Sequence, residues 1–232
     1  MIVVRPAAQR GATKLAWLDS RHSFSFNRYY DPQYMNFRAL RVINDDVIAP
    51  GGKFGMHPHQ DMEILTWVLE GAVAHQDSTG ACGEIRPGDA QKMSAGAGIF
   101  HSEANASGSE TLRLLQIWIE PDRSGLPPEY SQAHFHEARR RNTLRLIGAR
   151  DGRDGALLFH QDVDVYNGVL DPGATVTHSI EPGRYAWLQV ACGALTLNGV
   201  ALQSGDGAAL SGETEIVIQA AEPAELLLFD LA

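Results

Sequence analysis

Residues 51–71 of this chain read GGKFGMHPHQDMEILTWVLEG and residues 96–105 read GAGIFHSEAN, and these two stretches decide the fold. Each stretch places two ligand-type side chains two positions apart, shortly after a glycine-rich turn. Side chains at positions i and i+2 of a strand point to the same face of a sheet. Glycine lets the backbone turn sharply where such a strand begins or ends. The pattern therefore predicts two strands that carry polar side chains into one interior.

The two pairs of side chains have the chemistry of a metal site. His57 and His59 form the first pair, and His101 and Glu103 form the second. On neighbouring strands they would bring three imidazoles and one carboxylate together. This donor set suits a divalent transition metal ion, and iron, zinc, nickel, manganese, cobalt and copper are all compatible with it. Such a set also leaves coordination positions for water or substrate on an ion that prefers five or six ligands.

Short apolar segments recur along the rest of the chain. Their alternation with a period of two predicts half-buried strands, and turns rich in glycine, proline, asparagine and aspartate separate them. No long amphipathic helix is predicted, although residues 134–141 could form a short one. Many short strands at close spacing are typical of a sandwich or barrel. The clearest predicted strands are residues 39–43, 62–69, 112–119, 186–191 and 214–219.

The predicted strands fall into two groups. Residues 1–130 hold the metal motifs and are predicted to form the first domain, and residues 131–232 the second, with a connector spanning residues 122–141. A hairpin at residues 195–200, followed by the turn Ser204-Gly205-Asp206, is similar to the turn at residues 87–89 in the first domain. We therefore predict a duplicated barrel whose second copy has lost its metal ligands.

The composition restricts the class of function. With 232 residues, 44% hydrophobic and 20% charged, the chain can bury a core. A formal net charge of -9 disfavours direct binding to nucleic acid, and the basic run 139–141 is interpreted as solvated surface. No stretch approaches the roughly 20 apolar residues that span a membrane, and no cleavable signal is recognised, so a cytoplasmic protein is expected. Cys82 and Cys192 are too few for a disulfide framework.

The metal motifs resemble those of the cupin superfamily. Gly51, His57-x-His59, Glu63 and Gly71 resemble the first cupin motif, and Gly88 followed by Gly98-x-x-His101-x-x-x-Asn105 resembles the second. The distance from Glu63 to Gly71 is one residue longer than usual, and the second motif lacks its proline. These departures indicate a subgroup. The segments that are similar to the pirin family within that superfamily are residues 19–26, 40–46, 69–78, 93–103 and 115–119.

The resemblance to pirins implies a fold and a ligand set. The expected fold is an all-β bicupin, in which two β-barrel domains of the double-stranded β-helix type pack together and the second is degenerate. One divalent transition metal ion is expected, with iron as the first expectation. Pirin-like proteins take the acidic ligand from the position of Glu103, which its spacing from His101 favours independently. Ordinary cupins would use Glu63, which is interpreted here as a hydrogen-bonded acid outside the ligand set.

The same resemblance implies a function. Some short bacterial pirins are quercetin 2,3-dioxygenases, so a flavonol and O2 are the expected substrates and CO an expected product, with Glu103 as both ligand and catalytic base. The alternative is a metal- or redox-sensing regulatory protein that acts through contact with a protein partner. An open apolar cavity leading to the metal would favour the enzyme, and a filled interior the regulator. A monomer is expected in either case.

The remaining histidines are expected to have structural roles. His75 is predicted to be a surface or structural residue. His22 lies in an aromatic stretch, residues 22–30, that is predicted to pack in the core, with pocket lining as the alternative. Met93 and Phe100 are predicted to lie in the core or to touch the substrate. The other histidines that are interpreted as structural are His134, His136, His160 and His178.

Overall fold

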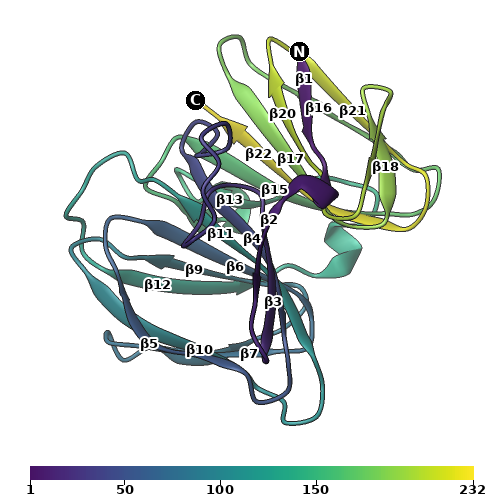
Figure 1. Ribbon diagram of the computed structural model, residues 1–232. Coiled ribbons are helices and arrows are strands. Elements are labelled where there is room, and N and C mark those ends of the chain that lie inside the picture. Colours follow the sequence, from purple (N-terminus) through teal and green to yellow (C-terminus); the bar gives the residue numbers. More distant parts are fainter. The chain divides into compact units, whose positions relative to one another are not determined.

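The computed structural model describes residues 1–232 and divides them into two compact units (Figure 1). The first unit consists of Gly11–His134 and Phe159–Gln161, and the second consists of Met1–Arg10, Phe135–Leu158 and Asp162–Ala232. Each unit contains one seven-stranded sheet and one four-stranded sheet. The predicted all-β architecture with two similar domains is confirmed.

The sheets of the first unit are formed by strands β2 to β12, which all pair antiparallel. In hydrogen-bonding order the larger sheet is β12 (Glu129–His134), β9 (Asp89–Ser94), β6 (Glu63–Glu70), β11 (Leu112–Ile119), β4 (Leu40–Ile48), β3 (Leu18–His22) and β2 (Gly11–Lys14). The smaller sheet is β5 (Lys53–His59), β10 (Ile99–Asn105), β7 (Val73–Asp77) and β8 (Cys82–Ile85).

The sheets of the second unit repeat this plan. The larger sheet is β1 (Ile2–Arg5), β20 (Gly207–Ser211), β17 (Tyr185–Cys192), β22 (Ala224–Leu231), β15 (Val163–Leu170), β13 (Arg145–Ala149) and β14 (Leu157–Leu158). The smaller sheet is β16 (Thr175–Ser179), β21 (Glu215–Ala220), β18 (Ala194–Leu197) and β19 (Val200–Gln203). The helices are single 3-10 turns at Ala7–Gln9, Glu137–Arg139 and Arg153–Gly155. None of them has the length and hydrophobicity that a membrane-spanning helix needs.

The limits of the two units differ from the division at residue 130 that the sequence suggested. Strand β1 pairs along its whole length with β20, so the first ten residues belong to the second unit. Strand β12 lies within the expected connector and pairs with β9, which keeps it in the first unit. Both pairings join segments that are distant in sequence, and local hydrophobic patterns do not report such partners.

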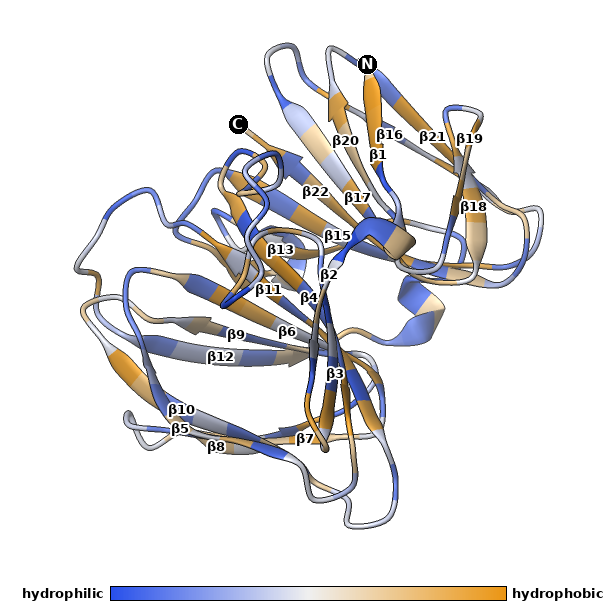
Figure 2. Ribbon diagram, viewed as in Figure 1, coloured by the Kyte–Doolittle hydropathy of each residue, from blue (hydrophilic) through white to orange (hydrophobic).

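The interiors of the two units differ in polarity. By strand order, β16 and β21 occupy the places in the second unit that β5 and β10 occupy in the first. The buried residues of β21 are Ile216, Ile218 and Ala220, and they belong to a large aliphatic cluster with residues of β17, β18, β20 and β22. Hydrophobic and hydrophilic bands alternate along many strands of both units (Figure 2). The second unit thus fills its interior with apolar side chains, whereas the first leaves room for polar ones.

Candidate metal centre

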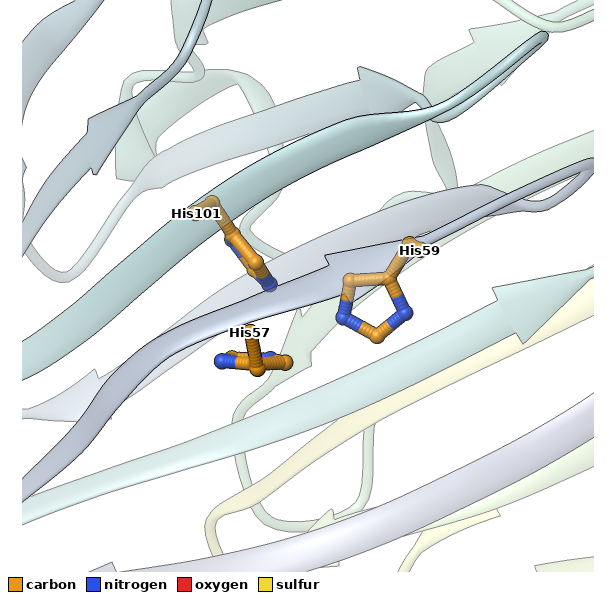
Figure 3. Close-up of side chains that lie close together, drawn as sticks. All are labelled: His57, His59 and His101. Atoms are coloured by element: carbon orange, nitrogen blue, oxygen red, sulfur yellow. The ribbon is translucent and has the colours of Figure 1, made fainter.

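The two predicted ligand pairs lie on adjacent strands. Strands β5 and β10 pair antiparallel, with His57 directly opposite His101. The ring centroids of His57, His59 and His101 are 4.4 to 4.8 Å apart, and one ring nitrogen of each lies within 4.8 Å of the others. Figure 3 shows the three imidazoles gathered around one common space. The structure therefore brings together three of the side chains that the spacing selected.

His101 carries the strongest local evidence that these residues fit a metal ion. Its residue is 1% exposed, and neither of its ring nitrogens has a hydrogen-bond partner in the protein. A buried polar nitrogen without a partner is costly and rare in folded proteins. His57 differs, because its Nδ1 lies 2.8 Å from the carbonyl oxygen of Gly55, which leaves Nε2 available as a donor to a metal. Three imidazoles with available lone pairs fit a divalent transition metal.

Glu103 is held beside this cluster by neutral hydrogen-bond donors. Its carboxylate accepts two contacts from Nε2 of Gln116, at 3.1 and 2.9 Å, and one from the hydroxyl of Thr66 at 3.3 Å. The pairing of β10 with β5 shifts register between His101 and Glu103, yet both side chains remain buried. Glu103 also lines the cavity that His57 and His59 line. The predicted acid is thus placed at the cluster, where it is firmly oriented.

His75 is a site residue whose place in the cluster the sequence interpretation missed. It is 3% exposed, and its donor atom lies within 4.8 Å of those of His101 and Glu103. Its Nε2 is 3.0 Å from Asp77, and its Nδ1 is 3.2 Å from the side-chain amide of Gln91. Both nitrogens are therefore occupied, so His75 supports the cluster and lacks a lone pair for a metal. The i, i+2 spacing of His75 and Asp77 on β7 was a signal that could have found it.

Burial and mutual repulsion keep the imidazoles of His59 and His101 neutral. Burial, followed by the charges of His57 and His75, lowers the pKa of His101 to about 3. Burial, followed by His101 and His57, lowers the pKa of His59 to about 4. A histidine binds a metal only through an unprotonated nitrogen. The site is therefore ready to accept a cation at neutral pH, without first releasing a proton from these two rings.

These shifts predict how acid affects the metal-free protein. In the unfolded chain a histidine side chain has a pKa of about 6.5, so His59 and His101 take up protons there below that pH, but in the folded protein they do not. Their contribution therefore lowers the free energy of unfolding as the pH falls from 6.5 toward 4. Asp46, whose pKa is raised to about 7, works in the opposite direction over that range. The combined effect of the two histidines is larger than that of Asp46. The urea midpoint of chelator-treated protein should therefore be lower at pH 5 than at pH 7.

A double variant provides the control for this pH dependence. In His59→Gln/His101→Gln only the opposing effect of Asp46 remains among the three groups, so the fall in urea midpoint between pH 7 and pH 5 should shrink or reverse. An equal fall in the double variant would assign the acid sensitivity to other groups.

A cavity of about 280 Å³ opens onto the cluster from the first unit's own interior. Its size is close to the lower end of the roughly 300–1,000 Å³ that small-molecule sites occupy. His57, His59 and Glu103 line one part of it, and aromatic side chains line much of the rest. The lining aromatic and aliphatic residues are Trp17, Phe26, Phe54, Trp118, Leu15 and Leu18. The cavity can therefore hold a flat apolar molecule against the metal cluster.

Glu63, the acid of the ordinary cupin motif, forms a buried ion pair with Lys92. It is buried at the start of β6, and its Oε2 lies 2.5 Å from Nζ of the buried Lys92. The same oxygen is 3.2 Å from the backbone nitrogen of His160, and Lys92 also lies 5.5 Å from the ring centroid of Phe159. This ion pair holds the segment 159–161 within the first unit. The interpretation of Glu63 as a hydrogen-bonded acid agrees with these contacts.

Replacing Glu63 by glutamine should destabilise the protein without emptying the metal site. The change leaves the Lys92 ammonium buried without its counter-charge, which typically costs about 3–5 kcal/mol. We expect a loss of about 3 kcal/mol in the free energy of unfolding by urea, with bound metal per folded chain unchanged. A Glu63→Gln variant that lost its metal but kept its stability would show that Glu63 is a metal ligand.

The other histidines and the two cysteines have ordinary surroundings. His22 is buried, lies 2.7 Å from Asn44 and 2.8 Å from Thr13, and lines the cavity, which matches the pocket-lining alternative. Met93 is buried in an apolar cluster, whereas Phe100 is 53% exposed. His134, His160 and His178 each lie beside a carboxylate. Cys82 and Cys192 are free thiols.

Comparison with known protein families gives matches to both halves of the chain. A family model described as Pirin matches residues 3–119, and one described as quercetinase C-terminal cupin domain matches residues 146–231. The chain is 49% identical over 231 residues to a protein of Escherichia coli (strain K12) named quercetin 2,3-dioxygenase, covering 100% of this chain and 99% of that protein. It is 43% identical over 234 residues to the pirin-like protein of Caulobacter vibrioides, covering 100% of both.

Solved structures show the same similarity in three dimensions. YhhW from Escherichia coli matches with a TM-score of 0.96 and 49% identity, covering 100% of this chain and 98% of that one. The bacterial pirin YhhW in complex with nickel(II), also from Escherichia coli, matches with a TM-score of 0.95 and 48% identity, covering 100% and 99%. That relative therefore binds a divalent transition metal of the kind that the donor set here suits.

Proposed function

This chain belongs to the pirin family, and from that premise we propose that it is a metal-dependent dioxygenase that cleaves a flavonol such as quercetin. The ring opens with incorporation of both atoms of O2, and one ring carbon leaves as CO, so the reaction needs no external reductant. A related protein with 49% identity carries the name of this activity. The regulatory role through a protein partner is the alternative.

The observation that carries this proposal is the aromatic cavity at the histidine cluster. A site that only senses a metal has no need of an apolar space beside the ion. Here the same cavity is lined by His57, His59 and Glu103 and by the aromatic rings of Trp17, Phe26, Phe54 and Trp118. Its shape and lining suit a planar aromatic substrate. The second unit, built on the same strand plan, holds a large cluster of buried aliphatic side chains in its interior.

We assign the metal to His57, His59, His101 and Glu103. Iron is our first expectation for the ion, and nickel, zinc, manganese, cobalt and copper suit the same donors. A bound divalent ion would supply Lewis acidity, lowering the pKa of a substrate hydroxyl that approaches it.

Glu103 is the residue that we expect to take the proton from that hydroxyl. Its carboxylate is oriented by Gln116 and Thr66, which donate hydrogen bonds but carry no charge that would weaken it as a base. The aromatic lining would orient the flat substrate rings and exclude water from the reacting atoms. Positioning by the cavity and proton removal by Glu103 are thus the two contributions of the protein.

Oxygen consumption tests this function directly. Protein loaded separately with each of the six metals would be mixed with quercetin in an oxygen electrode, with His101→Ala treated in parallel. We expect uptake of one O2 per quercetin consumed, with release of CO, and only in the chain that retains His101. Absence of uptake with every metal, although the ion is bound, would reject the dioxygenase and favour the regulatory alternative. The cytoplasmic location and the monomeric state stay predictions.

A further inference from the structure

A second acid, Asp46, lines the cavity and takes no part in the metal cluster. It is 4% exposed, and it belongs to the set of residues that enclose the cavity together with Glu103, Gln116 and Trp118. On β4 it alternates with Asn44, which also lines the cavity, while Asp45 between them does not. Asp46 therefore lies on the inner face of the large sheet.

The carboxyl group of Asp46 has one oxygen in use and one without a partner. Ser20, which is directly opposite Asp46 on β3, provides a side-chain hydrogen bond. The residue opposite on β11 is Leu114, which offers no polar side chain. Oδ1 of Asp46 is buried and has no hydrogen-bond partner in the protein. A buried acceptor without a partner costs free energy unless a ligand satisfies it.

Asp45 shows that this arrangement is specific to the inner face. Its carboxylate makes two contacts with the guanidinium of Arg113, at 3.0 and 3.1 Å, and it does not line the cavity. Neighbouring aspartates on one strand thus have different surroundings. The outer acid is paired with a cation, whereas the inner acid faces the cavity with one oxygen unused.

We propose that Asp46 is a specificity-determining residue, whose unused oxygen accepts a hydrogen bond from a hydroxyl group of the aromatic ligand. This inference rests on the proposed function in so far as the cavity binds a hydroxylated aromatic molecule. The hydroxyl in question is a second one, distinct from the hydroxyl that meets Glu103 and the histidines. A carboxyl group can accept this hydrogen bond in either protonation state.

This arrangement selects a chemical class of ligand. An aromatic molecule with a single hydroxyl group could satisfy the metal cluster or Asp46, but one with several hydroxyl groups could satisfy both. Sites that hydrogen-bond a ligand hydroxyl reject analogues without it strongly, because a buried polar group is then left unpaired. Polyhydroxylated aromatic ligands should therefore bind better than otherwise similar ligands that lack the hydroxyl facing Asp46.

Binding without turnover tests this proposal. Zinc-loaded protein would be titrated calorimetrically, in the absence of oxygen, with quercetin and with kaempferol, fisetin and galangin, which each lack one or two of its hydroxyl groups. We expect the wild-type protein to bind at least one of these analogues about tenfold more weakly than quercetin, the effect of one buried hydrogen bond. Asp46→Leu should bind quercetin about tenfold more weakly and no longer distinguish it from that analogue.

Two further variants keep the result interpretable. Asp46→Asn preserves the size of the side chain and retains an oxygen acceptor, so it should show a reduced preference, and it replaces Asp46→Leu if the latter fails to fold. Asp45→Asn makes the same change of charge on the outer face and should keep the full wild-type preference. Melting temperature and zinc content would be measured for each variant.

The outcomes separate this proposal from the dioxygenase itself. A hydroxyl preference that depends on Asp46, in a protein that never consumes oxygen, would support the binding role and reject the activity. Turnover of quercetin with the same ligand preference in Asp46→Leu as in the wild type would reject the role of Asp46 alone. A wild-type protein that does not bind quercetin, or an Asp46→Leu variant that binds quercetin as tightly as the wild type does, would also overturn the inference.

Discussion

Replacement of His101 by alanine is expected to abolish stoichiometric metal binding. His101 is the one residue shared by both groups of potential ligands, the first with His57 and His59 and the second with His75 and Glu103. It is also buried with two unpartnered nitrogens. His101 lies on β10, an inner strand of the smaller sheet. Wild-type protein should retain about one nickel ion per chain after gel filtration, and His101→Ala essentially none.

Two other histidine variants control this experiment. His134→Ala removes a half-exposed histidine beside Asp89, outside the cluster, and should keep the full metal content. His75→Ala removes a histidine whose two nitrogens are already bonded to Asp77 and Gln91, so it should weaken metal binding only modestly. Full nickel content in His101→Ala would refute the ligand assignment. If His75→Ala lost its nickel as completely as His101→Ala, the result would indicate that the ion binds to His75, His101 and Glu103.

Replacement of Glu103 by glutamine is expected to lower kcat for quercetin by a factor of about 100 or more. General base catalysis contributes typically about 10²–10⁴ to a rate, and an amide cannot take up the substrate's proton. The new amide would also face Nε2 of Gln116, which now donates to both carboxylate oxygens. Initial rates of oxygen uptake at saturating quercetin, divided by the metal content of each sample, measure the effect on catalysis separately from the loss of metal.

Glu84→Gln is the matched control for Glu103→Gln. Glu84 is an exposed acid on β8 that pairs with Arg86 on the surface, so its replacement should leave kcat within about twofold of the wild-type value. A Glu103→Gln variant that keeps its metal and more than a third of the wild-type kcat would show that the base lies elsewhere. Asp46 would then be the next acid to test, because it lines the same cavity.

Local sequence patterns predicted the strands of the first unit well. The strand expected at residues 112–119 is β11, and the one expected at 62–69 is β6, displaced by one residue. Both are inner strands of the larger sheet and most of their residues are buried. The i, i+2 spacing of the two ligand pairs also predicted a shared interior face, because side-chain direction along a strand depends only on its pleat.

The same rule would have found more of the site if it had been applied evenly. His75 and Asp77 on β7, and Asn44 and Asp46 on β4, are also polar pairs at i, i+2 on strands with buried residues. Neither pair stands in a cupin motif. Their importance depends on their distance from His101 and on whether their polar atoms have partners. Both properties arise from strands that are not adjacent in sequence.

Strand periodicity and ligand spacing are local properties of the chain, so the sequence was sufficient to predict the all-β class and the duplication and to select the four residues that we propose as metal ligands. The tertiary structure alone decided which strands are neighbours. It placed β1 in the second unit, paired Glu63 with Lys92, buried His75 beside His101, and left one oxygen of Asp46 unpaired at a cavity. Strand pairing across long sequence separations is set by the burial of complementary faces in the whole domain, and no short segment contains that information.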